Sequence, residues 1–272
     1  MESPVRDALR AALIARYGEA PEVPQGLAGL DELLRIAAHA THRDWSERPV
    51  GVELVRLLSA CAFAAPSKSF LQQADVVAVR DEAKRRAVEA LVPAMPWLRR
   101  APELLVFCGD GRRFRRLFER RGVRFANEHL DGFFNPVVDA SLVLMNFIRA
   151  AEAVGLVCCP ISVLRDRAGD LAGLLELPSH VVPVAGLAIG WPAGERAISP
   201  RLGLQATLHV DRFDADGIDA AIDAFDARYV AARRRVGAPS GAGWSDERVT
   251  QYASTQRADW GAFVRSQGFD LS

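Results

Sequence analysis

The stretch that decides the fold is residues 136–155, which read PVVDASLVLMNFIRAAEAVG. Wound as a helix, this stretch carries apolar side chains on nearly every side, a pattern typical of a helix buried in a protein core. Gly155 then offers the backbone freedom with which many helices end. The sequence therefore predicts a long core helix over residues 136–154.

Short runs rich in β-branched residues predict strands on both sides of this helix. Residues 75–80 and 103–109 come before it, and the second run ends in glycine, as buried strands often do. Residues 181–190 follow it and have high β propensity. Residues 207–210 could add a further short strand.

Apolar residues at helical spacing predict the other helices. The expected helices cover residues 3–17, 27–39, 50–63, 82–91, 218–235 and 244–269, and residues 156–161 lead into one more helix that ends before Pro178. Prolines and a glycine between residues 21 and 26 separate the first two of these helices.

The bulk composition describes an ordinary globular chain. Its 272 residues are 50% hydrophobic, long enough for a large core in one elaborated domain or in two. Because 34 basic residues balance 34 acidic ones, the net charge favours neither nucleic acid nor an anionic membrane as a partner. No targeting segment or membrane span is evident, so we expect a cytoplasmic protein.

Four short stretches and a tail together resemble one protein family. The stretches are His42-Arg43 after a helix, APSKSFLQ at 65–72, residues 139–156, and VAGLAIGWP at 184–192 followed by Pro200-Arg201-Leu202; the tail is Trp244-Ser245-Asp246. In this order and spacing they resemble the nitroreductase superfamily, and within it the NADPH-dependent branch of oxygen-insensitive nitroreductases and flavin reductases.

This resemblance implies an α+β fold in which a central mixed, mostly antiparallel sheet is flanked by helices. It implies a homodimer with an FMN in each of two sites built from both subunits, and a C-terminal extension that wraps the partner subunit. Residues 1–40 would be a helical extension, 41–235 the core domain and 236–272 the wrapping segment. NADPH or NADH would reduce the flavin, which would then reduce a small aromatic substrate in a two-electron, ping-pong cycle.

The resemblance also assigns the residues that would hold the FMN phosphate. His42 and Arg43 match the family's phosphate-binding pair, and an arginine suits phosphate because its guanidinium is a planar fork of donors. Ser46 stands where a second arginine is usual, so Arg48 is the candidate to replace it. Arg201 matches a late phosphate-binding arginine, and the lysine that often stands two residues before it is a serine here.

At the other predicted flavin contacts, some residues match those usual in the family and others differ from them. Ser67 and Ser69 either line the flavin or cap backbone groups of a helix-to-strand turn, and Lys68 between them either lies near the ring or points to solvent. Met95 replaces a polar amide and can pack against the ring without donating a hydrogen bond to it. A glycine-rich run that brings backbone amides to the ring is replaced by residues that include Ile161, Ser162 and Val163.

The cysteines and histidines give no second chemistry. All four cysteines lie in apolar stretches and are interpreted as reduced core thiols, Cys158 and Cys159 included, because the sequence places no base or cation beside that pair. The histidines show no metal-ligand spacing, so no metal is assigned. Arg233, Arg234 and Arg235 either bind the NADPH phosphate or neutralise a helix C-terminus.

Three functions therefore remain in view. The first is an FMN-dependent NAD(P)H oxidoreductase that reduces nitroaromatics, quinones or flavins. The second is a binding or regulatory module of the same fold whose hold on FMN is weakened or lost, as the departures at Ser46, Met95, Val163 and Ser199 suggest. The third is a flavin-dependent oxidase of specialised metabolism.

Overall fold

The computed structural model describes residues 4–237 and 241–272, and these form two compact units. One unit consists of residues 41–195 and 257–272 and contains the β-sheet. The other consists, among the described residues, of 4–40, 196–237 and 241–256 and is helical. The three-part division expected from the sequence stays a prediction.

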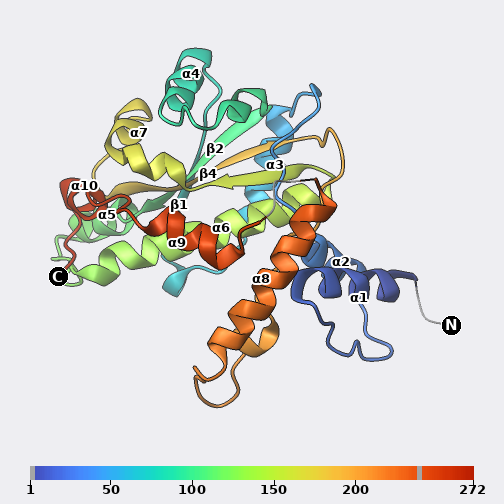
Figure 1. Cartoon of the computed structure of the whole chain (residues 1–272). Helices are drawn as coiled ribbons and strands as arrows, with labels where there is room; N and C mark the ends of the chain where they lie inside the picture. The colour runs from blue at the N-terminus through green and yellow to red at the C-terminus, as the bar shows by residue number, and fades with distance from the viewer. Residues whose placement is uncertain (1–3, 238–240) are drawn as a thin grey trace. The chain divides into compact units, whose positions relative to one another are not determined.

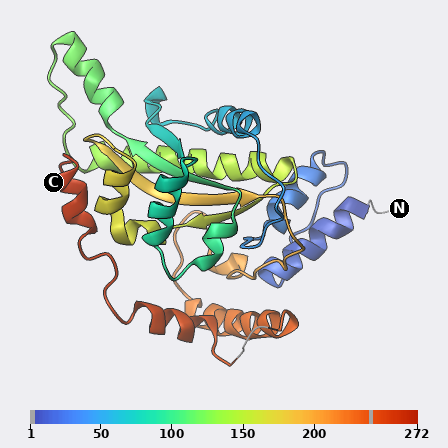
Figure 2. The same ribbon diagram turned by 90° about the horizontal axis from the view of Figure 1, so that it is seen from above.

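The sheet of the first unit has four strands, and every pair of neighbours is antiparallel. The strand order is β1 (Ala74–Ala78), β2 (Glu103–Asp110), β4 (Val181–Gly190), β3 (Val157–Ile161). The two central strands, β2 and β4, are buried along almost their whole length. The expected α+β class with a sheet flanked by helices is confirmed (Figure 1 and Figure 2).

Helices α3 (Val52–Ala62) and α6 (Leu130–Ala153) cover one face of the sheet. Because strand side chains alternate between faces, Leu105 and Phe107 of β2 point to this side. There Phe107 meets Phe147 of α6 edge to face, with ring centroids 5.7 Å apart. The long core helix predicted from the sequence is thus present, and its side that faces the sheet is buried.

That helix begins six residues earlier than predicted and carries Pro136 inside it. A proline inside a helix loses one backbone hydrogen bond, which made residue 136 look like a start. Pro136 packs instead against Gly109 at the end of β2, where an added Cβ would lie 2.9 Å from the Pro136 carbonyl carbon. Gly109 therefore lets the helix approach the sheet closely.

The opposite face of the sheet is covered by α4 (Glu82–Ala90), α7 (Ala168–Leu174) and the short 3-10 helices η2 (Pro96–Arg100) and η3 (Val163–Arg167). Leu104, Val106 and Cys108 of β2 point to this side. The C-terminal helix α10 (Trp260–Ser266) packs against α7, and Val264 and Phe269 join a small apolar cluster with Val182.

The helical unit contains α1 (Pro4–Tyr17), α2 (Leu30–Ala38), η4 (Leu204–Ala206), α8 (Ile218–Arg235) and α9 (Trp244–Tyr252). Leu9 and Ala12 of α1 pack with Ala37 of α2 in a core of their own. Residues 207–210 form no strand, which corrects the sequence prediction. Leu208 and Val210 are 66% and 76% exposed, so no burial favours an extended pairing there.

Three other expectations from the sequence were wrong. Residues 244–269 form α9 and α10 rather than one helix, because the polar stretch between them ends the first, with Arg257 at a φ of 52°. Cys61 is exposed rather than buried. Strand β3 and helix α5 (Arg112–Arg121) were not predicted, and the first amides of α5 donate to the Asp110 carboxylate. The short 3-10 helix η1 (Lys68–Phe70) lies in the loop before β1.

Candidate functional site

The segment that contains His42 and Arg43 runs along the outer edge of β3. The His42 amide donates to the Cys158 carbonyl at 3.0 Å, and the Ser46 amide donates to the Trp191 carbonyl at 2.9 Å. Between them, buried Trp45 donates its indole N–H to the Val157 carbonyl at 3.4 Å. These backbone contacts fix the predicted phosphate-binding pair against the sheet.

Arg43 is exposed and lies among aromatic and sulfur groups. Its guanidinium carbon is 5.6 Å from the centroid of the Trp97 ring, and Trp97 in turn lies 5.9 Å from Trp45. Burial raises the pKa of the Cys159 thiol. The Arg43 guanidinium, which is hydrogen-bonded to the thiol, lowers this pKa and so opposes part of the shift. The expectation that no cation neighbours this cysteine was therefore wrong.

The two cysteines nevertheless remain protonated, buried groups. Burial also raises the pKa of the Cys158 thiol, well above its ordinary value. A thiol with a raised pKa is a poor nucleophile near neutral pH, because the thiolate is the reactive form. Core packing, the interpretation favoured from the sequence, agrees with this burial.

Arg48 contacts an aromatic ring, and Ser46 carries no charge. The Arg48 guanidinium carbon lies 3.7 Å from the centre of the Trp191 ring, in cation–π contact. Trp191 is itself held because its indole N–H donates to the Pro49 carbonyl at 3.3 Å. Ser46 is half-buried. In this chain the Arg48 guanidinium therefore packs on the Trp191 ring. The Arg43 guanidinium is exposed and lies beside Trp97.

Met95, Ile161 and Val163 belong to the same face of the sheet as Trp45. All four contribute to the apolar cluster under α4 and α7, Ile161 being 1% exposed and Met95 and Val163 half-buried. Ser162 follows Ile161 and is exposed. The structure thus gathers the predicted residues 42–48, 95 and 161–163 around one face and edge of the sheet.

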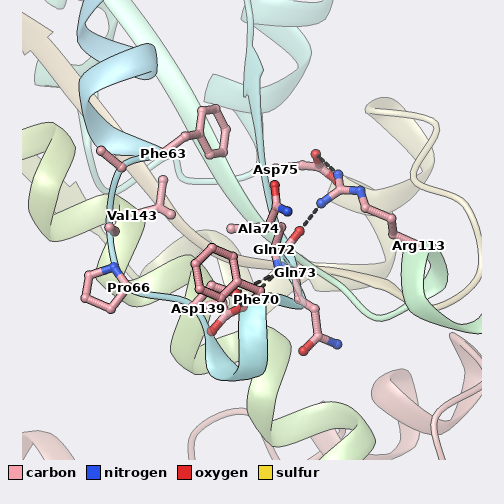
Figure 3. A pocket seen from close by; sticks show the side chains of 13 residues that line it. Phe63, Pro66, Phe70, Gln72, Gln73, Ala74, Asp75, Arg113, Asp139 and Val143 are labelled. Atoms are coloured by element: carbon pink, nitrogen blue, oxygen red, sulfur yellow. Dashed lines mark hydrogen bonds and ion pairs between the residues drawn. The ribbon is translucent and has the colours of Figure 1, made fainter.

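The loop that carries Ser67, Lys68 and Ser69 lies on the other face, against α6, and is anchored by Asp139 (Figure 3). Asp139 is 2% exposed, and its carboxylate accepts hydrogen bonds from the Ser67 hydroxyl at 2.8 Å, the Lys68 amide at 3.0 Å and the Gln73 amide at 3.1 Å. The Ser67 oxygen also accepts from the Gln72 amide at 2.7 Å. Ser67 therefore caps this turn.

The loop has an unusual backbone. Ser69, Phe70 and Gln72 have φ values of 49°, 59° and 52°, in the left-handed region that residues other than glycine rarely adopt. The side chains of Lys68 and Ser69 are exposed, and Phe70 is 89% exposed. Such conformations persist only where surrounding contacts enforce them, and the Asp139 carboxylate supplies those contacts here.

A cavity of about 730 Å³ opens beside this loop (Figure 3). Its lining includes Ser67, Gln73, Asp75, Arg113 and Val143. The side-chain oxygen of Gln73 is buried and accepts no hydrogen bond from the described residues. A buried acceptor without a donor is costly, so this oxygen is suited to a ligand N–H.

Asp75 and Asp110 form a carboxyl pair next to the cavity. Burial, followed by a hydrogen bond to Asp110, raises the pKa of Asp75 to about 6, although the Arg113 guanidinium opposes this. Arg113 lies 2.6 Å from an Asp75 oxygen and also donates to the Gln72 carbonyl. Burial alone would raise the pKa of Asp110, but hydrogen bonds from Asp75 and the α5 amides lower it. Asp75 is therefore the carboxyl that carries the shared proton.

Replacing Asp75 with asparagine should remove a pH dependence of stability. Because the folded pKa of Asp75 lies above its ordinary value of 3.8, its stabilising contribution is complete below about pH 4 and is lost as the pH rises through about 6. The full shift would correspond to roughly 3 kcal/mol, but the side chain is 39% exposed, so we expect about 1 kcal/mol.

Urea denaturation at pH 4.5 and pH 7.5 measures this effect. Relative to the D75N variant, the wild-type protein should lose about 1 kcal/mol of unfolding free energy between the two pH values. The exposed Asp223 of α8 is the control, and D223N should follow the wild type within about 0.5 kcal/mol. Parallel behaviour of D75N and the wild type would contradict the prediction.

Arg201 belongs to the helical unit, so it is described with that unit alone. Its amide donates to the Arg16 carbonyl at 2.6 Å, and its own carbonyl accepts from the Arg228 guanidinium at 3.0 Å. The Arg201 side chain is exposed and lines a hollow of about 530 Å³ together with Tyr17, Tyr229 and Trp244.

The arginines that end α8 differ in their surroundings. Arg233 pairs with Glu247 of α9 at 3.1 Å and donates to the Tyr229 hydroxyl at 3.1 Å. This ion pair is a structural role for one of the three arginines considered for NADPH. The residues immediately before Trp244 include 238–240, which lie outside the described residues.

Within residues 4–237 and 241–272, no three histidine, cysteine or acidic side chains come together in a way that could hold a metal ion. No helix in the same part of the chain is long and apolar enough to cross a bilayer. The sequence did not mark Trp97 or Gln73 as side chains of the candidate site. A further one, Asp139, was visible in the sequence as a carboxylate between the apolar residues Val138 and Ala140.

Comparisons with known proteins agree with this architecture. The solved structure of the hypothetical oxidoreductase YcnD from Bacillus subtilis superposes with a TM-score of 0.84 at 28% identity, covering 89% of this chain and 99% of that one. The FMN reductase (NAD(P)H) of Bacillus subtilis is 29% identical over 256 residues, 89% of this chain and 99% of the relative. The oxygen-insensitive NADPH nitroreductase of Salmonella typhimurium is 30% identical over 65% of this chain and 72% of its own length.

Family models give the same result. The model described as the nitroreductase family matches residues 36–191, and that of its C-terminal domain matches residues 199–272. The first model alone spans more than half of the sequence, and the resemblance seen in the short motifs is thereby confirmed: the chain belongs to the nitroreductase family.

Proposed function

We propose that this chain is an FMN-dependent NAD(P)H oxidoreductase that transfers two electrons to nitroaromatics, quinones or free flavin. The observation that carries the proposal is the likeness to an FMN reductase of Bacillus subtilis over 99% of that relative's length. When bound, FMN supplies the hydride chemistry, and the protein supplies binding, orientation and electrostatics. A cytoplasmic location is proposed with this activity.

We propose that residues of this chain bind FMN at both of its ends. His42 and Arg43 would hold the phosphate, because the exposed Arg43 guanidinium offers several donors in one plane. Arg201 is proposed as a further phosphate ligand from the family resemblance alone. The buried, unpartnered oxygen of Gln73 would accept from an N–H of the flavin ring. Trp97 and Met95 would supply apolar contact, and water can supply protons.

A second copy of this chain is proposed to complete each site. Residues 42–48, 95 and 161–163 gather on one face and edge of the sheet, whereas the loop of Ser67 to Ser69 lies on the other face. One chain therefore offers two half-sites. The loop cavity and the residues near Arg43 would each meet the complementary half from the partner.

Helix α6 offers a surface for such a dimer. Five of its large apolar residues are 36–56% exposed, an unusual density for a surface in contact with water. They recur every three or four positions and so form one stripe along the helix: Leu130, Phe134, Val138, Leu142 and Met145. The wrapping role of residues 236–272 remains part of the proposal, and α10 within them packs on its own unit.

Weakened FMN binding is the second candidate, and the contact of Arg48 with Trp191 favours it. With Ser46 and Ser199 in place of cations, two charge-assisted contacts are missing, which costs on the order of 2–5 kcal/mol. Nanomolar affinity corresponds to about −12 kcal/mol, so the loss leaves FMN binding near micromolar. NADPH and NADH both remain proposed donors.

Absorbance spectra of the purified protein, recorded with and without added FMN, test the proposal. We expect a bound-flavin spectrum at micromolar FMN, followed by bleaching when NADPH or NADH is mixed in under anaerobic conditions. A protein that neither binds nor quenches FMN at tens of micromolar would exclude the enzyme. Flavin binding with negligible reduction by both nicotinamides would favour the specialised oxidase instead.

A further inference from the structure

Arg16 is a buried arginine in the last turn of α1, and it contacts the backbone of two distant segments. Only 5% of the residue is exposed. Its guanidinium donates to the Ala37 carbonyl at 3.0 Å and 3.3 Å, to the His39 carbonyl, and to the Ser199 carbonyl at 2.8 Å. All of these partners belong to the helical unit.

One of these segments leads directly to a residue that is proposed to hold phosphate, because Ser199 stands two positions before Arg201. The Arg16 backbone adds to the same arrangement, because its carbonyl accepts from the Arg201 amide at 2.6 Å. Arg201 is thus fixed through its amide by Arg16 and through its carbonyl by Arg228.

Helix α1 lies outside both ranges that the family models match, residues 36–191 and 199–272. The B. subtilis relative aligns over 99% of its own length yet covers 89% of this chain, so this chain has residues that the relative lacks. The contacts of Arg16 are therefore made by a part of the chain that the family models do not describe.

A guanidinium is well suited to this task. It has five N–H donors in a rigid plane and stays protonated, so it can bind several carbonyl oxygens at fixed angles. A backbone carbonyl that is buried without a donor costs free energy, so both segments are more stable when their carbonyls accept from Arg16. A side chain of the same length without donors would leave these carbonyls unpaired and release the segments.

We propose that Arg16 is a positioning residue for phosphate recognition, through which helix α1 holds the segment ending at Arg201. This inference rests on the proposed FMN-dependent function. Arg16 is not proposed to touch the phosphate or the flavin, because its guanidinium donates to backbone carbonyls. Its loss should therefore weaken the recognition of the phosphate and spare the recognition of the ring.

The experiment compares FMN with riboflavin, which has the same ring and no phosphate. Fluorescence quenching gives the affinity of each ligand for the full-length wild type and for R16M, R16K and R10M. R16M keeps the apolar stem of Arg16 and loses its donors, and R10M is the control because Arg10 is exposed on the same helix. Far-UV circular dichroism and melting temperature report whether each variant folds.

We expect R16M to bind FMN about 10- to 100-fold more weakly, by analogy with the loss of partners that orient metal-binding residues. Riboflavin affinity should change by less than about twofold, R10M should match the wild type, and R16K should lie between. If R16M does not fold, the FMN-to-riboflavin affinity ratio of R16K tests the role of Arg16 in phosphate recognition instead.

Two results would overturn the inference. One is an unchanged FMN-to-riboflavin affinity ratio in a folded Arg16 variant, and the other is an equal loss for both ligands, which would mean a general structural role. Failure of the wild type to bind either ligand would instead refute the proposed function, so the two failures are distinguishable.

Discussion

Replacing Asp139 with alanine should lower the unfolding free energy by about 3–5 kcal/mol, the cost of removing one partner from a buried, charged hydrogen-bond group. The side chain is 2% exposed, and its loss leaves the Ser67 hydroxyl and the amides of Lys68 and Gln73 without their acceptor. Urea denaturation at pH 7 measures the change.

The backbone of the loop adds to this effect. Ser69, Phe70 and Gln72 each occupy a conformation that costs on the order of 1–3 kcal/mol in strain. Without Asp139 the loop would relax toward negative φ and the cavity beside it would change shape. The D139A variant should therefore also bind FMN more weakly.

Two variants separate this role from general effects of mutation. D139N keeps the volume and one acceptor oxygen, so it should lose about half as much stability as D139A. Asp131 lies exposed in the first turn of the same helix, and D131A should lose less than about 1 kcal/mol. A D139A protein as stable as D131A would show that the loop does not depend on Asp139.

Removing Arg43 and Arg201 together should weaken FMN binding by about two to four orders of magnitude, because each charge-assisted phosphate contact is worth roughly 1.5–3 kcal/mol. Each single alanine variant should cost about 10- to 100-fold. Riboflavin affinity should stay nearly constant, since neither residue is proposed to touch the ring. Titration of both ligands by fluorescence quenching gives the numbers.

Arg116, whose side chain is 69% exposed on α5, provides the matched control. An R116A protein should bind FMN as the wild type does. If the double variant R43A/R201A retained wild-type FMN affinity, these two arginines would not be the phosphate ligands, and the assignment carried over from the family would be wrong for this chain.

Local sequence patterns predicted the elements that are richest in apolar residues. Strands β2 and β4 are buried along almost their whole length, and helix α6 is mostly apolar, so composition alone marked them. Strand β3 escaped because Pro160 and two cysteines weaken its β signal, although an edge strand tolerates proline. Helix α5 has few apolar residues, and its Phe114 and Phe118 each pack edge to face against Phe125, which lies beyond its end.

The sequence suggested which residues belong to the candidate site, but it did not predict how they are arranged in space. Short motifs identified His42, Arg43 and Ser67, but which face of the sheet each occupies depends on strand pairing between distant parts of the chain. Arg48 illustrates the difference, because its position suggested a phosphate ligand whereas the Trp191 ring lies under its guanidinium. The role of Asp139 likewise appears only once α6 lies beside residues 67–73.

The backbone contacts of residues 42–46 with β3 also bear on solubility. An uncovered edge strand can template pairing with another chain. Here the His42 amide donates to the Cys158 carbonyl of edge strand β3, and Trp45 pairs with Pro192 just after β4. Gly190 permits this fit, because an added Cβ would lie 2.7 Å from the Trp45 ring. A redesign of residues 42–46 for a different cofactor would therefore also decide whether the protein resists aggregation.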